Sequence, residues 1–198
     1  MTADRIPKSL DLPPDEVPDG LVIETRQPQP VPFGEESLEF HASRLLFLLK
    51  YAGGRKAKVT GRTKIAKLDF FVRYPTYLKK AAELKGFQAD ITADARPEST
   101  MIRYKYGPWD PKYYNVFALL VARGLITVEP SDKGDIFELT LRGQYVVEEL
   151  SGPDFNDIVE RCQLVKRLFG QDTGTAIKDF IYKNFPEVVA MSLGEEIG

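Results

Sequence analysis

Apolar residues recur at three- and four-residue steps from residue 37 onward, which is the pattern of helices that bury one face. The first stretch begins near Ser37 and ends at Gly53 and Gly54, because glycine readily adopts the left-handed conformation that closes a helix. A second helix is expected to begin with Thr63 as its N-cap, and a third with Pro75 as its first residue. This part of the chain therefore predicts helices that pack together.

The pattern changes in the middle of the chain. Residues 102–106 alternate in a way that favours a strand, and residues 107–109 are expected to turn the chain. Asp110 and Pro111 then provide the N-cap and first residue of another helix. Gly124 is expected to end that helix.

Two short strands and one more helix follow. Residues 125–129 and 135–139 are joined by a Pro-Ser-Asp-Lys-Gly segment, which predicts a hairpin. Thr140 is expected to cap a helix with these inward positions: Leu141, Tyr145, Val146 and Leu150. Strand, helix, hairpin and helix is the order of a winged helix, in which the hairpin is the wing. We therefore expect an α+β fold, mainly α, in which a winged-helix domain carries extra helices at both ends.

Composition divides the chain into three parts. Residues 1–34 hold half of the fourteen prolines, and nine acidic against three basic residues through Glu39 give that end a charge of −6. Because proline fixes φ and lacks an N–H, we expect this leader to be extended or disordered, or to wrap a partner. Residues 35–150 are expected to form the winged-helix core, and residues 151–198 a C-terminal helical extension.

No spacing in the chain points to a catalytic centre. A single histidine, His41, and a single cysteine, Cys162, cannot form a Cys/His zinc site, and both are expected to be buried. No phosphate-binding loop and no Gly-x-Ser-x-Gly motif is present. We therefore expect a protein that is not an enzyme, with no catalytic residue, no cofactor and no metal.

The expected cellular location follows from targeting and membrane patterns that the sequence lacks. No apolar run reaches the length of a membrane span, and residues 1–7 do not resemble a signal peptide. One cysteine fits a reducing compartment. The cytoplasm is the expected location, with no membrane partner.

Positive charge is concentrated between Arg55 and Lys85, where ten basic and two acidic residues give +8 in a chain of net charge −2. Such a segment could follow the phosphates of double-stranded DNA, meet an acidic protein surface or the acidic leader of its own chain, or be a solvated helix face. The candidate residues for binding nucleic acid or an acidic partner are Arg55, Lys56, Lys58, Arg62, Lys64 and Lys67.

Aromatic residues cluster after this segment. The group consists of Tyr104, Tyr106, Trp109, Tyr113 and Tyr114, with Arg103 and Lys105 between the first members. It could stack on nucleic-acid bases, but packing within the core is the expectation that we favour.

Three phrases together resemble a known family. They are KLDFFVRYP at 67–75, IRYKYGPWDPKY at 102–113 and IKDFIYKNFPEV at 177–188. The set resembles the middle-component subunits of bacterial ABC-three-component systems, which include Lamassu-type anti-phage defence. The likeness covers about residues 37–190.

This resemblance implies a non-catalytic winged-helix accessory subunit that bridges an SMC-like ABC ATPase and an effector in an antiviral defence complex. It supplies no catalytic residues. Two other functions stay open: a winged-helix regulator that binds DNA, and a Panacea-type antitoxin, which the chain resembles more weakly through its Tyr-Gly-Pro turn at 106–108.

Overall fold

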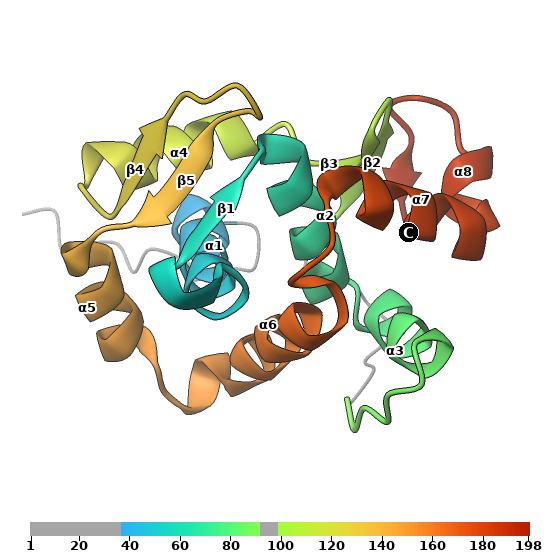
Figure 1. The fold of residues 1–198 in the computed structure, drawn as a ribbon, viewed down its shortest axis with the longest axis horizontal. Coiled ribbons are helices and arrows are strands. Elements are labelled where there is room, and N and C mark those ends of the chain that lie inside the picture. The colour runs from blue at the N-terminus through green and yellow to red at the C-terminus, as the bar shows by residue number, and fades with distance from the viewer. Residues whose placement is uncertain (1–36, 92–98) are drawn as a thin grey trace, which may run out of the picture. The chain divides into compact units, whose positions relative to one another are not determined.

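Figure 1 shows the chain as a computed structural model, which describes residues 37–91 and 99–198. The chain divides into two units, Met1–Val31 and Pro32–Gly198, and all described residues belong to the second. This unit is α+β and mainly helical, as the sequence predicts, with small antiparallel sheets. The leader, residues 1–34, lies outside the described residues.

The elements of the described residues follow one another in this order. The α-helices are α1 (Leu38–Ala52), α2 (Arg62–Arg73), α3 (Pro75–Leu84), α4 (Tyr113–Ala122), α5 (Leu141–Leu150), α6 (Asn156–Phe169), α7 (Gly174–Asn184) and α8 (Pro186–Ala190). The 3-10 helices are η1 (Gly54–Lys56) and η2 (Pro153–Phe155). The strands are β1 (Lys58–Thr60), β2 (Met101–Tyr104), β3 (Gly107–Trp109), β4 (Ile126–Glu129), β5 (Ile136–Leu139) and β6 (Glu196–Ile197).

The core is built around α1, which contacts α2, α4, α5, α6, β1 and β5 (Figure 1). Every residue from His41 to Leu49 is buried, so this helix is covered on more than one face. Ser37 caps its start by accepting a hydrogen bond from the Phe40 N–H, and Gly53 closes its end, as predicted. Helix α6 lies against both α1 and α2, so the C-terminal segment completes the core around them.

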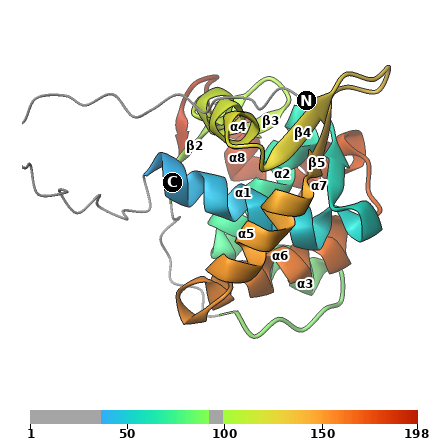
Figure 2. The same cartoon turned by 90° about the vertical axis from the view of Figure 1, so that its left-hand side faces the viewer.

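The first sheet has the strand order β1-β5-β4. The predicted hairpin forms its β4 and β5 strands, and Figure 2 shows the turn of this hairpin extending past the helices. Strand β1 pairs with β5, with Val59 opposite Phe137. The sequence does not predict β1, because three residues with one buried side chain give no readable alternation.

The second sheet has the order β3-β2-β6. Strand β2 confirms the strand predicted at 102–106, although it ends at Tyr104. The turn predicted at 107–109 was wrong: the chain turns at Lys105 and Tyr106, and residues 107–109 form β3. Gly107, with φ of 115°, permits the tight return. Because β2 pairs with β3 and β6, it belongs to a different sheet from the β4–β5 hairpin.

Two predicted helix starts were shifted. Helix α2 begins at Arg62 rather than after Thr63. The reason is that the carbonyl of Gly61 already accepts hydrogen bonds from the N–H groups three and four residues further on, at 64 and 65. Asp110 accepts from the Lys112 N–H in a turn that precedes α4. Helix α3 begins at Pro75, as predicted.

The predicted inward face of α5 was wrong at two of its four positions. Leu141 is 86% exposed and Tyr145 is 61% exposed, whereas Val146 and Leu150 pack partly buried against the core, as predicted, and Gly143 and Val147 are buried. The glycine causes this rotation, because a Cβ at Gly143 would lie 2.0 Å from the carbonyl oxygen of Leu125. The helix approaches the backbone at the one position that has no side chain, so Leu141 and Tyr145 on either side of it point outward.

Candidate functional site

Four of the six candidate basic residues line one cavity of about 380 Å³, which we call the basic cavity. They are Arg55, Lys56, Lys58 and Lys64. Lys166 of α6 adds a fifth cation, which was not among the residues predicted from the sequence. Only the packing of α6 against α1 and α2 brings this lysine to the segment at 55–64, so no local sequence signal could have identified it.

The other two candidates lie outside the basic cavity. Arg62 is exposed, and its Nε lies 3.1 Å from Oδ2 of Asp135 on the hairpin. Lys67 is buried, and its Nζ donates to the carbonyl of Thr63 at 3.0 Å. Burial, together with the charge of Lys178, lowers the pKa of Lys67 to about 8. The six residues therefore do not form one continuous basic face.

The walls of the basic cavity come from the end of α1, from η1 and β1, from the start of α2 and from the end of α6. The reversal between α1 and β1 is tight, since a Cβ at Gly53 would lie 2.4 Å from the Lys58 nitrogen. Gly54 and Ala57 both have left-handed backbones, with φ of 70° and 48°. This turn holds Arg55 and Lys56 at the rim, where both are exposed.

The cations of the basic cavity have no carboxylate at ion-pair distance among the described residues. No carboxylate is among the residues that line it. Across residues 37–91 and 99–198, none of its five cationic side chains has an ion pair or a hydrogen bond with a carboxylate. Burial lowers the pKa of Lys64, and the charge of Asp172, which lies outside the lining, opposes that shift. The cavity is thus concave and cationic.

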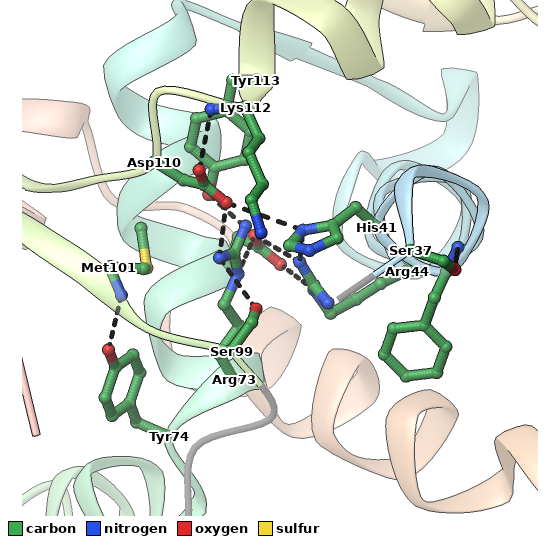
Figure 3. A network of polar contacts seen from close by, with 12 residues as sticks. Ser37, His41, Arg44, Arg73, Tyr74, Ser99, Met101, Asp110, Lys112 and Tyr113 are labelled. Carbon is green, nitrogen blue, oxygen red and sulfur yellow. Dashed lines mark hydrogen bonds and ion pairs between the residues drawn. The ribbon is translucent and has the colours of Figure 1, made fainter. Parts of the chain in front are cut away.

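A second cluster of charges is fully buried between α1, α2 and the turn before α4 (Figure 3). The Asp69 carboxylate accepts from Arg44 Nε at 2.8 Å, Arg73 Nε at 2.8 Å and the Tyr113 hydroxyl at 2.7 Å. Arg73 Nη1 also lies 2.7 Å from Oδ2 of Asp110. We call this cluster, with His41, the buried ion network.

The buried ion network holds its members in fixed charge states. Burial favours protonation of Asp69, but the charges and hydrogen bonds of Arg44 and Arg73 hold its pKa well below the ordinary range. Burial and the same two arginines lower the pKa of His41 to about 4. The neutral imidazole accepts at Nδ1 from Arg44 Nη2, 3.0 Å away. The charges neutralise each other, and the network joins three helices.

An apolar groove lies between α4 and the β4–β5 hairpin, with a volume of about 460 Å³. Helix α4 contributes side chains at steps of three and four residues: Tyr114, Phe117, Ala118, Val121 and Ala122. Val128 and Phe137 line the hairpin side, and the Arg62–Asp135 pair lies at the rim. Tyr114 is 58% exposed and Val121 is 45% exposed, so this face, which we call the α4 groove, is open to solvent.

An aromatic recess of about 450 Å³ adjoins the start of α4. Tyr104, Tyr106, Trp109 and Tyr114 line it together with Arg62, whose guanidinium lies 5.9 Å from the Tyr114 ring centroid. Tyr113, the remaining member of the predicted aromatic group, is buried in the ion network. The group is therefore divided: one member is core and the others border solvent.

The remaining candidates are the single histidine and the single cysteine of the chain. His41 and Cys162 are both buried, as predicted. Among residues 37–91 and 99–198, no group of three or more His, Cys, Asp and Glu side chains is arranged to hold a metal ion. No helix in the same residues has the length and apolar character to cross a bilayer.

Comparison of the chain with known protein families, with curated proteins and with solved structures finds no match. The function must therefore be argued from the surfaces described above.

Proposed function

We propose that the chain is a winged-helix adaptor subunit, without a catalytic centre of its own, that binds a larger protein through the α4 groove. The order of elements supports this. A helix, a strand, two further helices and a hairpin make up a winged helix, and α1, β1, α2, α4 and the β4–β5 hairpin follow that order. The sheet order β1-β5-β4 places the first strand beside the returning strand of the hairpin. Helix α3 and strands β2 and β3 are then an insertion between α2 and α4, and β6 from the C-terminal segment completes their sheet.

In this arrangement α4 has the position of the helix that enters the DNA major groove in DNA-binding relatives of the fold. Reading of base edges there needs side chains such as Arg, Lys, Asn or Gln. The outer face of α4 carries Tyr114, Ala118, Val121 and Ala122 instead, and Asn115 is the one amide side chain in the helix. The chemistry of this face favours a protein partner over base pairs.

The groove fits an amphipathic helix of the partner. A concave apolar surface with contacts spaced along a helix is the usual acceptor for such a segment. The Arg62–Asp135 pair at the rim supplies both signs of charge for the partner's polar edge. The α4 groove is the observation that carries this proposal.

The resemblance of the chain to middle-component subunits gives the partner a class. We infer that the groove binds an SMC-like ABC ATPase, and that the chain links this ATPase to an effector in an anti-phage defence complex. No step of catalysis is assigned to the chain in this role.

Purification of the tagged full chain from its native cells tests the proposal. We expect a large coiled-coil ATPase to copurify, and Val121→Glu to abolish that association because it places a carboxylate in the α4 groove. Leu141→Glu on α5 is the matched control, since that side chain is exposed elsewhere and its substitution should leave the complex intact.

Two results would overturn the proposal. If both variants recovered the ATPase equally, the α4 groove would not be part of the interface. Recovery of one small toxin instead of an ATPase would favour the antitoxin function.

A further inference from the structure

We propose that the basic cavity binds the phosphate group of a small phosphorylated ligand, such as a phosphate monoester or a mononucleotide. This inference is independent of the α4 groove and of its partner. It rests on the charge, the shape and the placement of the cavity.

The charge argument comes from the contrast with other surface cations. Lys50, Lys80 and Lys85 each lie within 4.0 Å of a carboxylate oxygen. The five cations of the basic cavity have no such partner among residues 37–91 and 99–198. Cations that converge without compensation repel one another, and a bound anion relieves that repulsion. A phosphate dianion offers several acceptor oxygens to side chains that can only donate.

The shape argument comes from the three segments that converge on the cavity. Arg55 and Lys56 enter from the η1 turn, Lys58 and Lys64 from β1 and the first turn of α2, and Lys166 from α6. The volume of about 380 Å³ lies within the usual range of small-molecule sites and exceeds the size of a bare phosphate ion. The space beyond the phosphate can therefore hold the group that carries it.

Placement favours a small ligand over a duplex. Binding along DNA uses cations spread beside successive phosphates, whereas these five surround one concavity. Thr60 and Gln171 add a hydroxyl and an amide to the lining, which can donate to or accept from a sugar or similar group. Moreover, Arg62, the cation next to α4, lies outside the cavity.

The test uses the purified full chain and four probes at constant ionic strength: inorganic phosphate, adenosine monophosphate, adenosine and a short DNA duplex. Calorimetry should detect binding of phosphate and of the nucleotide, with tighter binding of the nucleotide, and none of adenosine. Thermal unfolding should shift to higher temperature with the same two probes, because a ligand that binds only the folded state stabilises it.

Substitutions test whether the ligand binds in the basic cavity. Lys56→Gln combined with Lys64→Gln and Lys166→Gln should weaken binding at least about tenfold, the size expected when charge-assisted contacts are lost. Lys79→Gln, an exposed lysine of α3 outside the cavity, is the matched control and should leave binding unchanged. Circular dichroism spectra and thermal unfolding without ligand would establish that both variants fold.

Three results would overturn the proposal. They are no binding of either phosphate-bearing probe, equal binding by the triple variant and the parent chain, and binding of the duplex alone. The last result would instead assign the cavity to the DNA backbone.

Discussion

The buried ion network and the basic cavity both gather charged side chains, yet they differ in how those charges are compensated. In the buried network two arginines meet the carboxylates of Asp69 and Asp110, and every one of these side chains is almost fully buried. In the basic cavity five cations line a concavity that has no carboxylate in its lining. A closed and compensated cluster holds elements together, whereas an open and uncompensated one is available to a ligand.

This contrast also separates residues that the sequence places in one group. Arg73 and Lys64 both belong to the +8 segment. Arg73 is fully buried and bound to carboxylates on two elements, whereas Lys64 lies at the edge of the cavity. Net charge along the sequence therefore overstates the charge that the surface offers, because part of it is neutralised inside the core.

The largest expected effect is at the centre of the buried ion network. Asp69→Asn keeps the shape but removes the charge that compensates Arg44 and Arg73, which stay buried. Breaking a buried ion pair by removing one partner costs about 3–5 kcal/mol. Urea unfolding should report a loss of that size. A loss below about 1 kcal/mol would mean that the two arginines find other partners, and the distinction between the two clusters would fail.

The next effect concerns pH. The unfolded chain protonates His41 below its ordinary pKa of 6.5, whereas the folded chain keeps it neutral to about pH 4. In that window the unfolded state binds more protons, so stability falls as the pH falls, by up to about 3 kcal/mol. Asp69, whose folded pKa is lowered, adds a further loss as the pH falls below its ordinary value of 3.8.

Unfolding curves between pH 7 and pH 4 measure the histidine contribution. His41→Asn is the matched variant, because its amide oxygen can accept from Arg44 and does not titrate. The variant should lose less stability than the parent chain across this window. Identical slopes would show that burial and the charges of Arg44 and Arg73 do not hold the imidazole neutral against Asp69 and Asp110, which favour its protonation.

The helices were predictable because each signal is local. Ser37, Pro75 and Thr140 mark helix starts through their own hydrogen bonds or their fixed φ, and the structure confirms all three. The hairpin was predictable for the same reason, from its turn residues and the alternating strands on either side. The face that a helix buries depends on tertiary packing, which local signals do not contain. Gly143 rotated the expected face of α5 so that Leu141 and Tyr145 are exposed, since apolar spacing does not reveal a close approach of backbones.

The candidate site was predictable only in part. The run at 55–64 marks four members of the basic cavity, but Lys166 joins them through tertiary packing. Lys67 is buried instead, with its side chain beside Gly107 of β3. The α4 groove had a readable signal in its spacing, although the sequence alone does not distinguish a helix face that meets the core from one that meets a partner.

The smallest effect tests compensation at two lysines. Lys85 Nζ lies 3.0 Å from Oδ2 of Asp172, whereas Lys56 lines the basic cavity, which has no carboxylate in its lining. Lys56→Gln removes one of the converging cations and should stabilise the ligand-free chain by up to about 0.5 kcal/mol at low salt, a gain that added salt screens away. Lys85→Gln removes an attractive pair and should destabilise it by about 0.5–1 kcal/mol. Urea unfolding at two chloride concentrations measures both changes. If the two substitutions shifted stability in the same direction, other groups would already compensate the cations of the basic cavity. The reason to expect an anion there would then be lost.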